Sequence, residues 1–94
     1  MLNNPEMYGK MPKNQQLQLL KWIENNLIQR NTINMDISSY GLKHIFENSK
    51  DGFYITNGEF KGAMLMSGYK IKNPNDINWY FNISQKSKCL RRNL

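Results

Sequence analysis

The sequence predicts an α+β fold, a winged helix-turn-helix of three helices with a small antiparallel sheet and a wing hairpin. Apolar residues recur every three or four positions in three segments and alternate with polar residues in three others. The helical segments are about 14–29, 40–48 and 57–67, and the alternating segments are 33–37, 69–72 and 77–83. Their order is that of a winged helix, in which the third helix enters a nucleic-acid groove. The 94 residues are enough for one such domain.

Residues 1–12 hold two prolines and a glycine without any periodicity, so they predict a flexible N-terminal arm. Asn14 then caps the first helix. The apolar stripe of this helix consists of Leu17, Leu20, Ile23 and Leu27. The short strand at 33–37 leads to the second helix, for which Ser38 or Ser39 is the N-cap.

The third helix has the clearest local signal. A capping box opens it, in which the Thr56 hydroxyl accepts from the Glu59 N–H and the Glu59 carboxylate accepts from the Thr56 N–H. Gly68 is suited to the left-handed residue that ends it. If Phe60, Ala63 and Met64 are buried, the face toward solvent consists of Asn57, Gly58, Lys61, Gly62 and Leu65. The two glycines leave room for a close approach, either by a ligand backbone or by another helix of the same domain.

The predicted hairpin turns at Asn73–Asp76 and is followed by an alternating strand. The strand residues that face the core are Ile77, Trp79, Phe81 and Ile83. Beyond them the chain is polar and basic, without apolar periodicity. We therefore divide the chain into the arm, a winged-helix domain at 13–84 and a basic C-terminal tail at 85–94.

The charge is one-sided, since 13 Lys and Arg against 7 Asp and Glu give a net +6. The usual partners of a small basic domain are nucleic acid, an anionic membrane surface or an acidic protein. No apolar run approaches the roughly 20 residues of a transmembrane helix, and the N-terminus lacks the apolar stretch of a signal peptide. We therefore expect a cytoplasmic protein with no membrane partner, and the single Cys89 agrees with a reducing compartment.

The residue types that carry chemistry do not suggest a catalytic site. The single histidine, His44, and the single cysteine, Cys89, fall in different elements, and a lone histidine on a helix is usually a packing residue. The carboxylates show no metal-ligand spacing, and the Gly58–Gly62 segment is not a phosphate-binding loop. We expect no enzymatic activity, no cofactor and no metal.

Three stretches, 39–44, 54–64 and 78–82, carry a resemblance to other proteins. They resemble small proteins carried by phages, plasmids and chromosomal cassettes of Gram-positive bacteria, and the likeness spans about half the chain. In size, element order and basicity the chain is also similar to winged-helix single-strand DNA-binding and replication-accessory proteins of staphylococcal cassette elements. The resemblance implies a nucleic-acid-binding protein of a mobile genetic element, and it points to no catalytic residue.

The sequence thus predicts a non-enzymatic protein that binds nucleic acid with low specificity in replication or regulation. DNA is favoured over RNA, and single strands over a specific operator, because the third helix offers few side chains for bidentate base contacts. Tyr80 is suited to stacking on a base, and the tail cations to a clamp on phosphates. The candidate contacts are Asn57, Lys61, Lys70, Lys72, Asn75, Tyr80, Lys86, Lys88, Arg91 and Arg92. The wing and tail residues are also compatible with a merely solvated surface, and Tyr80 with packing under the N-terminal arm.

The alternative is a protein-binding module, such as a phage-type inhibitor of a host or defence enzyme or an accessory subunit of a replication enzyme. Its basic charge would then meet an acidic partner site, and Leu65 and Met66 would matter more than the lysines. A transcriptional repressor comes third, because repressors usually dimerise and the sequence contains no additional dimerisation helix.

Overall fold

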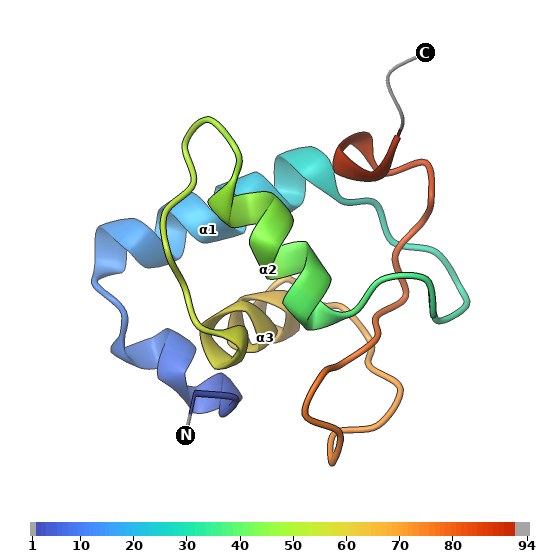
Figure 1. Ribbon diagram of the computed structural model, residues 1–94, viewed down its shortest axis with the longest axis horizontal. Helices are drawn as coiled ribbons and strands as arrows, with labels where there is room; N and C mark the ends of the chain where they lie inside the picture. The colour runs from blue at the N-terminus through green and yellow to red at the C-terminus, as the bar shows by residue number, and fades with distance from the viewer. Residues whose placement is uncertain (1, 92–94) are drawn as a thin grey trace.

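The structure is a computed structural model that describes residues 2–91, and it is built from helices (Figure 1). Three are α-helices: α1 (Lys13–Asn26), α2 (Ser39–Glu47) and α3 (Asn57–Met66). Two are short 3-10 helices: η1 (Pro5–Lys10) and η2 (Lys88–Leu90). Within the described residues no strand or sheet forms, so the predicted α+β winged helix is wrong.

The predicted hairpin is reduced to isolated contacts. Its two segments pair in one antiparallel bridge, Ile71 with Phe81, and a second bridge joins Gln29 to Ile83. Side chains occupy the backbone groups that a regular ladder would pair: the Asn82 amide oxygen accepts from the Lys70 N–H, and the Ser39 hydroxyl accepts from the N–H of Trp79. Two backbone bonds, from the Lys72 N–H to the Tyr80 carbonyl and from the Asn82 N–H to the Lys70 carbonyl, accompany the Ile71–Phe81 bridge, and the pairing does not extend beyond them.

The last segment nevertheless keeps much of its predicted alternation. Trp79, Phe81 and Ile83 are buried, as predicted, whereas Ile77 is exposed. Backbone carbonyls along this segment accept from the N–H groups of Arg30, Asn34 and Ser39 at 2.7–2.9 Å. The segment therefore runs through the fold as an extended core element with bonds to both sides, and it does not project as a wing.

The N-cap signals of the second and third helices and the glycine that ends the third helix are confirmed. The Ser38 hydroxyl accepts from the Gly41 N–H, and both halves of the Thr56–Glu59 capping box are present. Gly68 has φ 85°, the left-handed conformation expected of the residue that ends α3.

The first helix differs from its prediction in bounds and in orientation. Pro12 stands at its N-cap without a side-chain cap, so Asn14 does not cap it, and it ends at Asn26. Its buried side chains are Leu19 and Ile23, continued by Leu27, while Leu17 is 59% exposed. The face of α1 that packs on the core is thus centred on Leu19, Ile23 and Leu27, and the predicted stripe that began at Leu17 lies partly toward solvent.

The N-terminal segment does not lie free as an arm but packs as η1 along α3 (Figure 1). Tyr8 is buried there. The approach depends on two glycines: a Cβ at Gly58 would collide with the backbone of Asn4, and one at Gly62 with the carbonyl oxygen of Pro5. The glycines of α3 therefore serve packing within the domain, the second of the two interpretations of the sequence.

The start of the C-terminal tail is likewise tied to the fold. The buried Ser87 hydroxyl accepts from the Ile28 N–H at 2.8 Å, and the Ser84 N–H donates to the Ile28 carbonyl at 2.8 Å. This pair of bonds brings η2 against the end of α1 (Figure 1).

The substitution Gly62→Ala tests the contact between η1 and α3. Alanine favours a helix over glycine by about 1 kcal/mol, but the collision with Pro5 forces η1 away. We expect a net loss of about 1–2 kcal/mol of unfolding free energy, measured by urea denaturation followed by tryptophan fluorescence. Gly9→Ala is the matched control, because its Cβ would meet nothing within 4 Å. Equal or higher stability of Gly62→Ala would contradict the packing described.

Candidate functional site

The α3 residues predicted to contact nucleic acid are buried inside the protein. Lys61 is 2% exposed and Asn57 6% exposed. The Lys61 ammonium donates to the carbonyl oxygens of Asn3 at 3.1 Å and Asp76 at 3.4 Å, and it lies 4.7 Å from the centre of the Trp79 ring. Burial lowers the pKa of Lys61, against the opposing effect of the Asp76 charge. The prediction that these side chains face solvent is therefore wrong, because the N-terminal segment and the loop at 73–78 cover them.

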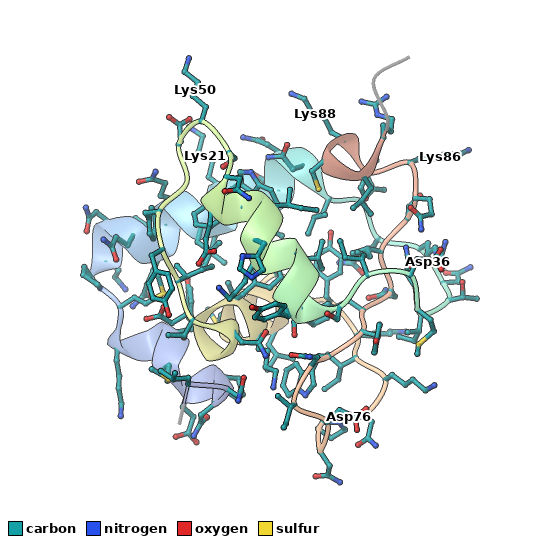
Figure 2. All side chains as sticks on the ribbon, viewed as in Figure 1. Lys21, Asp36, Lys50, Asp76, Lys86 and Lys88 are labelled. Carbon is teal, nitrogen blue, oxygen red and sulfur yellow. The ribbon has the colours of Figure 1, made fainter. Side chains whose placement is uncertain are left out.

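The other predicted contacts lie on two separate parts of the surface. Lys70, Lys72 and Asn75 are exposed on the loop that follows α3, near a half-buried Tyr80. Lys86, Lys88 and Arg91 are exposed around η2, and Arg92 lies outside the described residues. Figure 2 shows Asp76 of the loop at the lower edge of the molecule and Lys86 and Lys88 at the upper right. The structure therefore does not gather the predicted residues into one binding face.

A cavity of about 490 Å³ lies between α2, the start of α3 and the N-terminal residues. It is lined by Leu2, Asn3, Tyr40, Lys43, His44, Glu47, Tyr54, Thr56 and Asn57. Helix α2 supplies four of these side chains at positions three or four apart, so they share one face of the helix. The cavity brings together aromatic, cationic, anionic and amide groups.

Glu47 organises the charges of this cavity. Its carboxylate lies 2.9 Å from the Lys43 ammonium and 3.1 Å from Nδ1 of His44, and it accepts the Ile55 N–H at 3.0 Å. Burial raises the pKa of Glu47, but the Ile55 N–H, the Lys43 ammonium and His44 together outweigh burial and hold the pKa below its ordinary value of 4.5. Glu47 is therefore ionised at neutral pH, and it orients the imidazole of His44.

Two tyrosines flank the buried Lys43 ammonium. The centre of the Tyr40 ring lies 5.4 Å from it and that of Tyr54 5.2 Å, within the range of cation–π attraction. Tyr40 is 51% exposed and Tyr54 74% exposed. His44 stands edge-on to Tyr40, with ring centres 4.4 Å apart. The tyrosine rings thus present aromatic surface to solvent while a fixed cation holds them.

Asn57 contributes a buried acceptor without a partner. Its amide nitrogen donates to the side-chain oxygens of Asn3 and Asn78 and to the Ile77 carbonyl, at 3.0–3.1 Å. These three acceptors fix the orientation of the amide, and its oxygen is left without a hydrogen bond within the described chain. A buried acceptor of this kind costs about 1–3 kcal/mol unless something satisfies it.

The combination suits a planar heterocycle. Aromatic faces stack on it, while an ammonium donor and carboxylate and amide acceptors can bond its edge, as in single-strand recognition of bases. Sequence analysis missed Tyr40, Lys43, Glu47 and Tyr54. The spacing of Tyr40 with His44 and of Lys43 with Glu47, four residues each, was visible in the sequence, but the approach of Tyr54 to this helix face was not.

The Glu47 environment has a consequence for acid stability. Because the folded-state pKa is depressed, ionised Glu47 contributes stability above pH 4.5, and this contribution is lost as pH falls through the folded-state value. We expect Glu47→Gln to lower the unfolding free energy by about 2 kcal/mol at neutral pH and by much less near pH 3. Urea denaturation at both pH values measures the difference, with the exposed Glu6→Gln as control. An equal loss at both pH values would contradict the assignment.

Charge reversal at Lys61 tests its buried position. A carboxylate there would face two carbonyl oxygens and the Trp79 ring, so Lys61→Glu should lose about 3 kcal/mol or more of unfolding free energy. The same change at the exposed Lys70 should stay within about 0.5 kcal/mol. Thermal unfolding by circular dichroism compares the two variants, and equal stability would show that Lys61 faces solvent.

The described residues contain neither a metal-binding cluster nor a membrane-spanning helix. Among residues 2–91 no group of three or more His, Cys, Asp or Glu side chains is placed to hold a metal ion. Within the same residues no helix has the length and apolar character needed to cross a membrane. No family model, curated protein or solved structure matches the chain.

Proposed function

We propose that the protein binds single-stranded nucleic acid without catalysis, with an unpaired base stacked on Tyr40 or Tyr54 at the mouth of the cavity. The observation that carries the proposal is the pair of exposed tyrosine rings held on either side of the Lys43 ammonium. Tyrosine provides a large contact area with few rotatable bonds, so little entropy is lost when a base stacks on it.

The polar groups around the rings support a nucleobase as the bound heterocycle. Asn57 and Glu47 line the cavity, and their side-chain oxygens are the kind of acceptor that an exocyclic amino group requires. Stacking does not discriminate strongly between bases, which agrees with low sequence specificity.

The surface charge supports a polyanionic ligand. The only ion pairs among the described residues involve Glu47, so no exposed lysine or arginine of that part is paired. The exposed cations of the described residues are Lys10, Lys13, Lys21, Lys50, Lys70, Lys72, Lys86, Lys88 and Arg91. Figure 2 shows Lys50, Lys86 and Lys88 extending outward from the upper edge of the molecule. Such cations attract phosphates regardless of sequence and make binding salt-dependent.

The burial of α3 supports single strands over duplex DNA. With Lys61 and Asn57 covered, α3 does not offer the polar face that a recognition helix needs in a major groove. The role that we propose for this binding, in replication or regulation of a mobile genetic element, is the one that the sequence resemblance implies.

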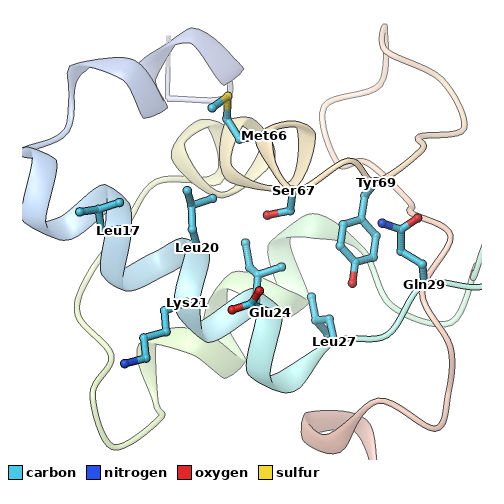
Figure 3. A pocket seen from close by; sticks show the side chains of 10 residues that line it. Leu17, Leu20, Lys21, Glu24, Leu27, Gln29, Met66, Ser67 and Tyr69 are labelled. Carbon is cyan, nitrogen blue, oxygen red and sulfur yellow. The ribbon is translucent and has the colours of Figure 1, made fainter.

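A second candidate function, docking of a protein, is favoured by one observation. Leu65 and Met66 at the end of α3 are exposed, and Met66 borders a groove against α1 that is lined by both apolar and polar side chains (Figure 3). A groove of this kind is a common site of protein contact. It lies apart from the tyrosine cavity, so the two functions are compatible.

The double variant Tyr40→Ala with Tyr54→Ala tests the stacking role. Loss of base–aromatic stacking typically costs 1–3 kcal/mol per base, so affinity for a labelled single-stranded oligonucleotide should fall roughly tenfold or more. Fluorescence anisotropy measures the affinity of the parent and the variant for single-stranded DNA, RNA and duplex DNA of equal length. The comparison also shows which class of nucleic acid binds.

The matched control is Tyr40→Phe with Tyr54→Phe, which keeps both aromatic faces and should retain affinity. Tyr80→Ala should also leave affinity unchanged, since Tyr80 is not among the residues that line the cavity. Equal affinity of the alanine and phenylalanine variants would contradict stacking at this site. A parent protein that binds no oligonucleotide at low salt would overturn the proposed function itself.

A further inference from the structure

The groove between α1 and the end of α3 has a volume of about 590 Å³, and the proposed binding of nucleic acid does not use it. Its walls include Leu17 and Leu20 of α1 and Met66 of α3, and Figure 3 shows Leu20 pointing from α1 toward the end of α3. Leu17 is 59% exposed and Met66 67% exposed, although both are large apolar side chains. The groove continues along α1 to Leu27 and Tyr69, which close its far end.

Two opposite charges lie on the same stretch of α1. Lys21 and Glu24 both line the groove and both are exposed. They are three residues apart on the helix, a spacing at which ion pairs commonly form. No ion pair joins them or links either of them to another described residue. The groove therefore has a free cation and a free anion at its edge, one helical turn apart.

We propose that this groove is the contact surface between two copies of the chain, related by a two-fold axis that passes between the two α1 helices, level with residues 22 and 23. With the two α1 helices antiparallel, Lys21 of each copy lies opposite the partner's Glu24. Leu17 of each copy then lies at the end of the partner's groove near Leu27 and Tyr69.

A second copy is the occupant because the surface complements itself. A two-fold contact requires that each residue of the patch meet its complement on an identical patch. Here the exposed Leu17 and the groove that would receive it lie on one face, and so do the cation and the anion. A partner of one charge sign would leave either Lys21 or Glu24 opposed by a like charge. The net charge of +6 on each copy opposes association, so the dimer forms at high protein concentration.

The test is a set of charge reversals measured by sedimentation equilibrium from micromolar to near-millimolar concentration at physiological salt. We expect the parent to dimerise. Lys21→Glu and Glu24→Lys should each weaken the dimer roughly tenfold or more, because each places like charges opposite one another twice. Both positions are exposed on the helix, and circular dichroism checks that each variant is folded.

The decisive arm is an equimolar mixture of the two single variants. One variant carries two anions at the contact and the other two cations, so the mixture should dimerise where neither variant does alone. The double variant with both reversals should also dimerise, and Lys13→Glu, outside the groove, should behave as the parent. A monomeric parent at all concentrations, or a mixture that stays monomeric, would overturn the proposal. Oligonucleotide binding at Tyr40 and Tyr54 is independent of this outcome.

Discussion

The contact between η1 and α3 across Gly58 and Gly62 is the constraint on which the rest of the structure depends. Without side chains at these two positions, the backbone at Asn4 and Pro5 comes close enough to cover one side of the helix. The same approach places the Asn3 carbonyl over the Lys61 ammonium, which desolvates the cation and satisfies it at once. Helix α3 is therefore enclosed by the core on one side and by η1 on the other, and it organises the fold instead of reading a ligand.

Because α3 is enclosed, the accessible aromatic and charged groups of the candidate site belong to α2 and to the segment before α3. The three hydrogen bonds of the Asn57 amide join the N-terminus, the start of α3 and the loop before Trp79, so the wall of the cavity is rigid. Helix α2 packs on α3 and turns Tyr40, Lys43 and Glu47 toward that wall. The candidate site is thus a junction of three parts of the chain that are distant in sequence.

The lysine side chains fall into two groups, one buried and one exposed. Lys43 and Lys61 are buried and satisfied by a carboxylate, by carbonyl oxygens and by aromatic rings, so they stabilise the fold. The exposed cations have no ion pairs within the described residues, which leaves the positive surface free for a polyanion. The groove beside α1, with the exposed Leu17 and Met66 in its lining, shares no residue with the tyrosine cavity, so the two proposed binding surfaces are separate.

The sequence by itself determined the features that depend on bonds between residues a few positions apart. The Ser38 cap, the Thr56–Glu59 capping box and the Gly68 helix end are as predicted, because their donors and acceptors are adjacent in the chain. Only the tertiary structure decided which face of α3 is covered, since glycines and a lysine on one helix face suit solvent or a close neighbour equally well. It also decided against a sheet: the pairing of the predicted hairpin stops at the Ile71–Phe81 bridge, and the Ser39 and Asn82 side chains bond backbone groups 12 or more residues away. Such long-range contacts follow from what approaches in space, and no local pattern encodes them.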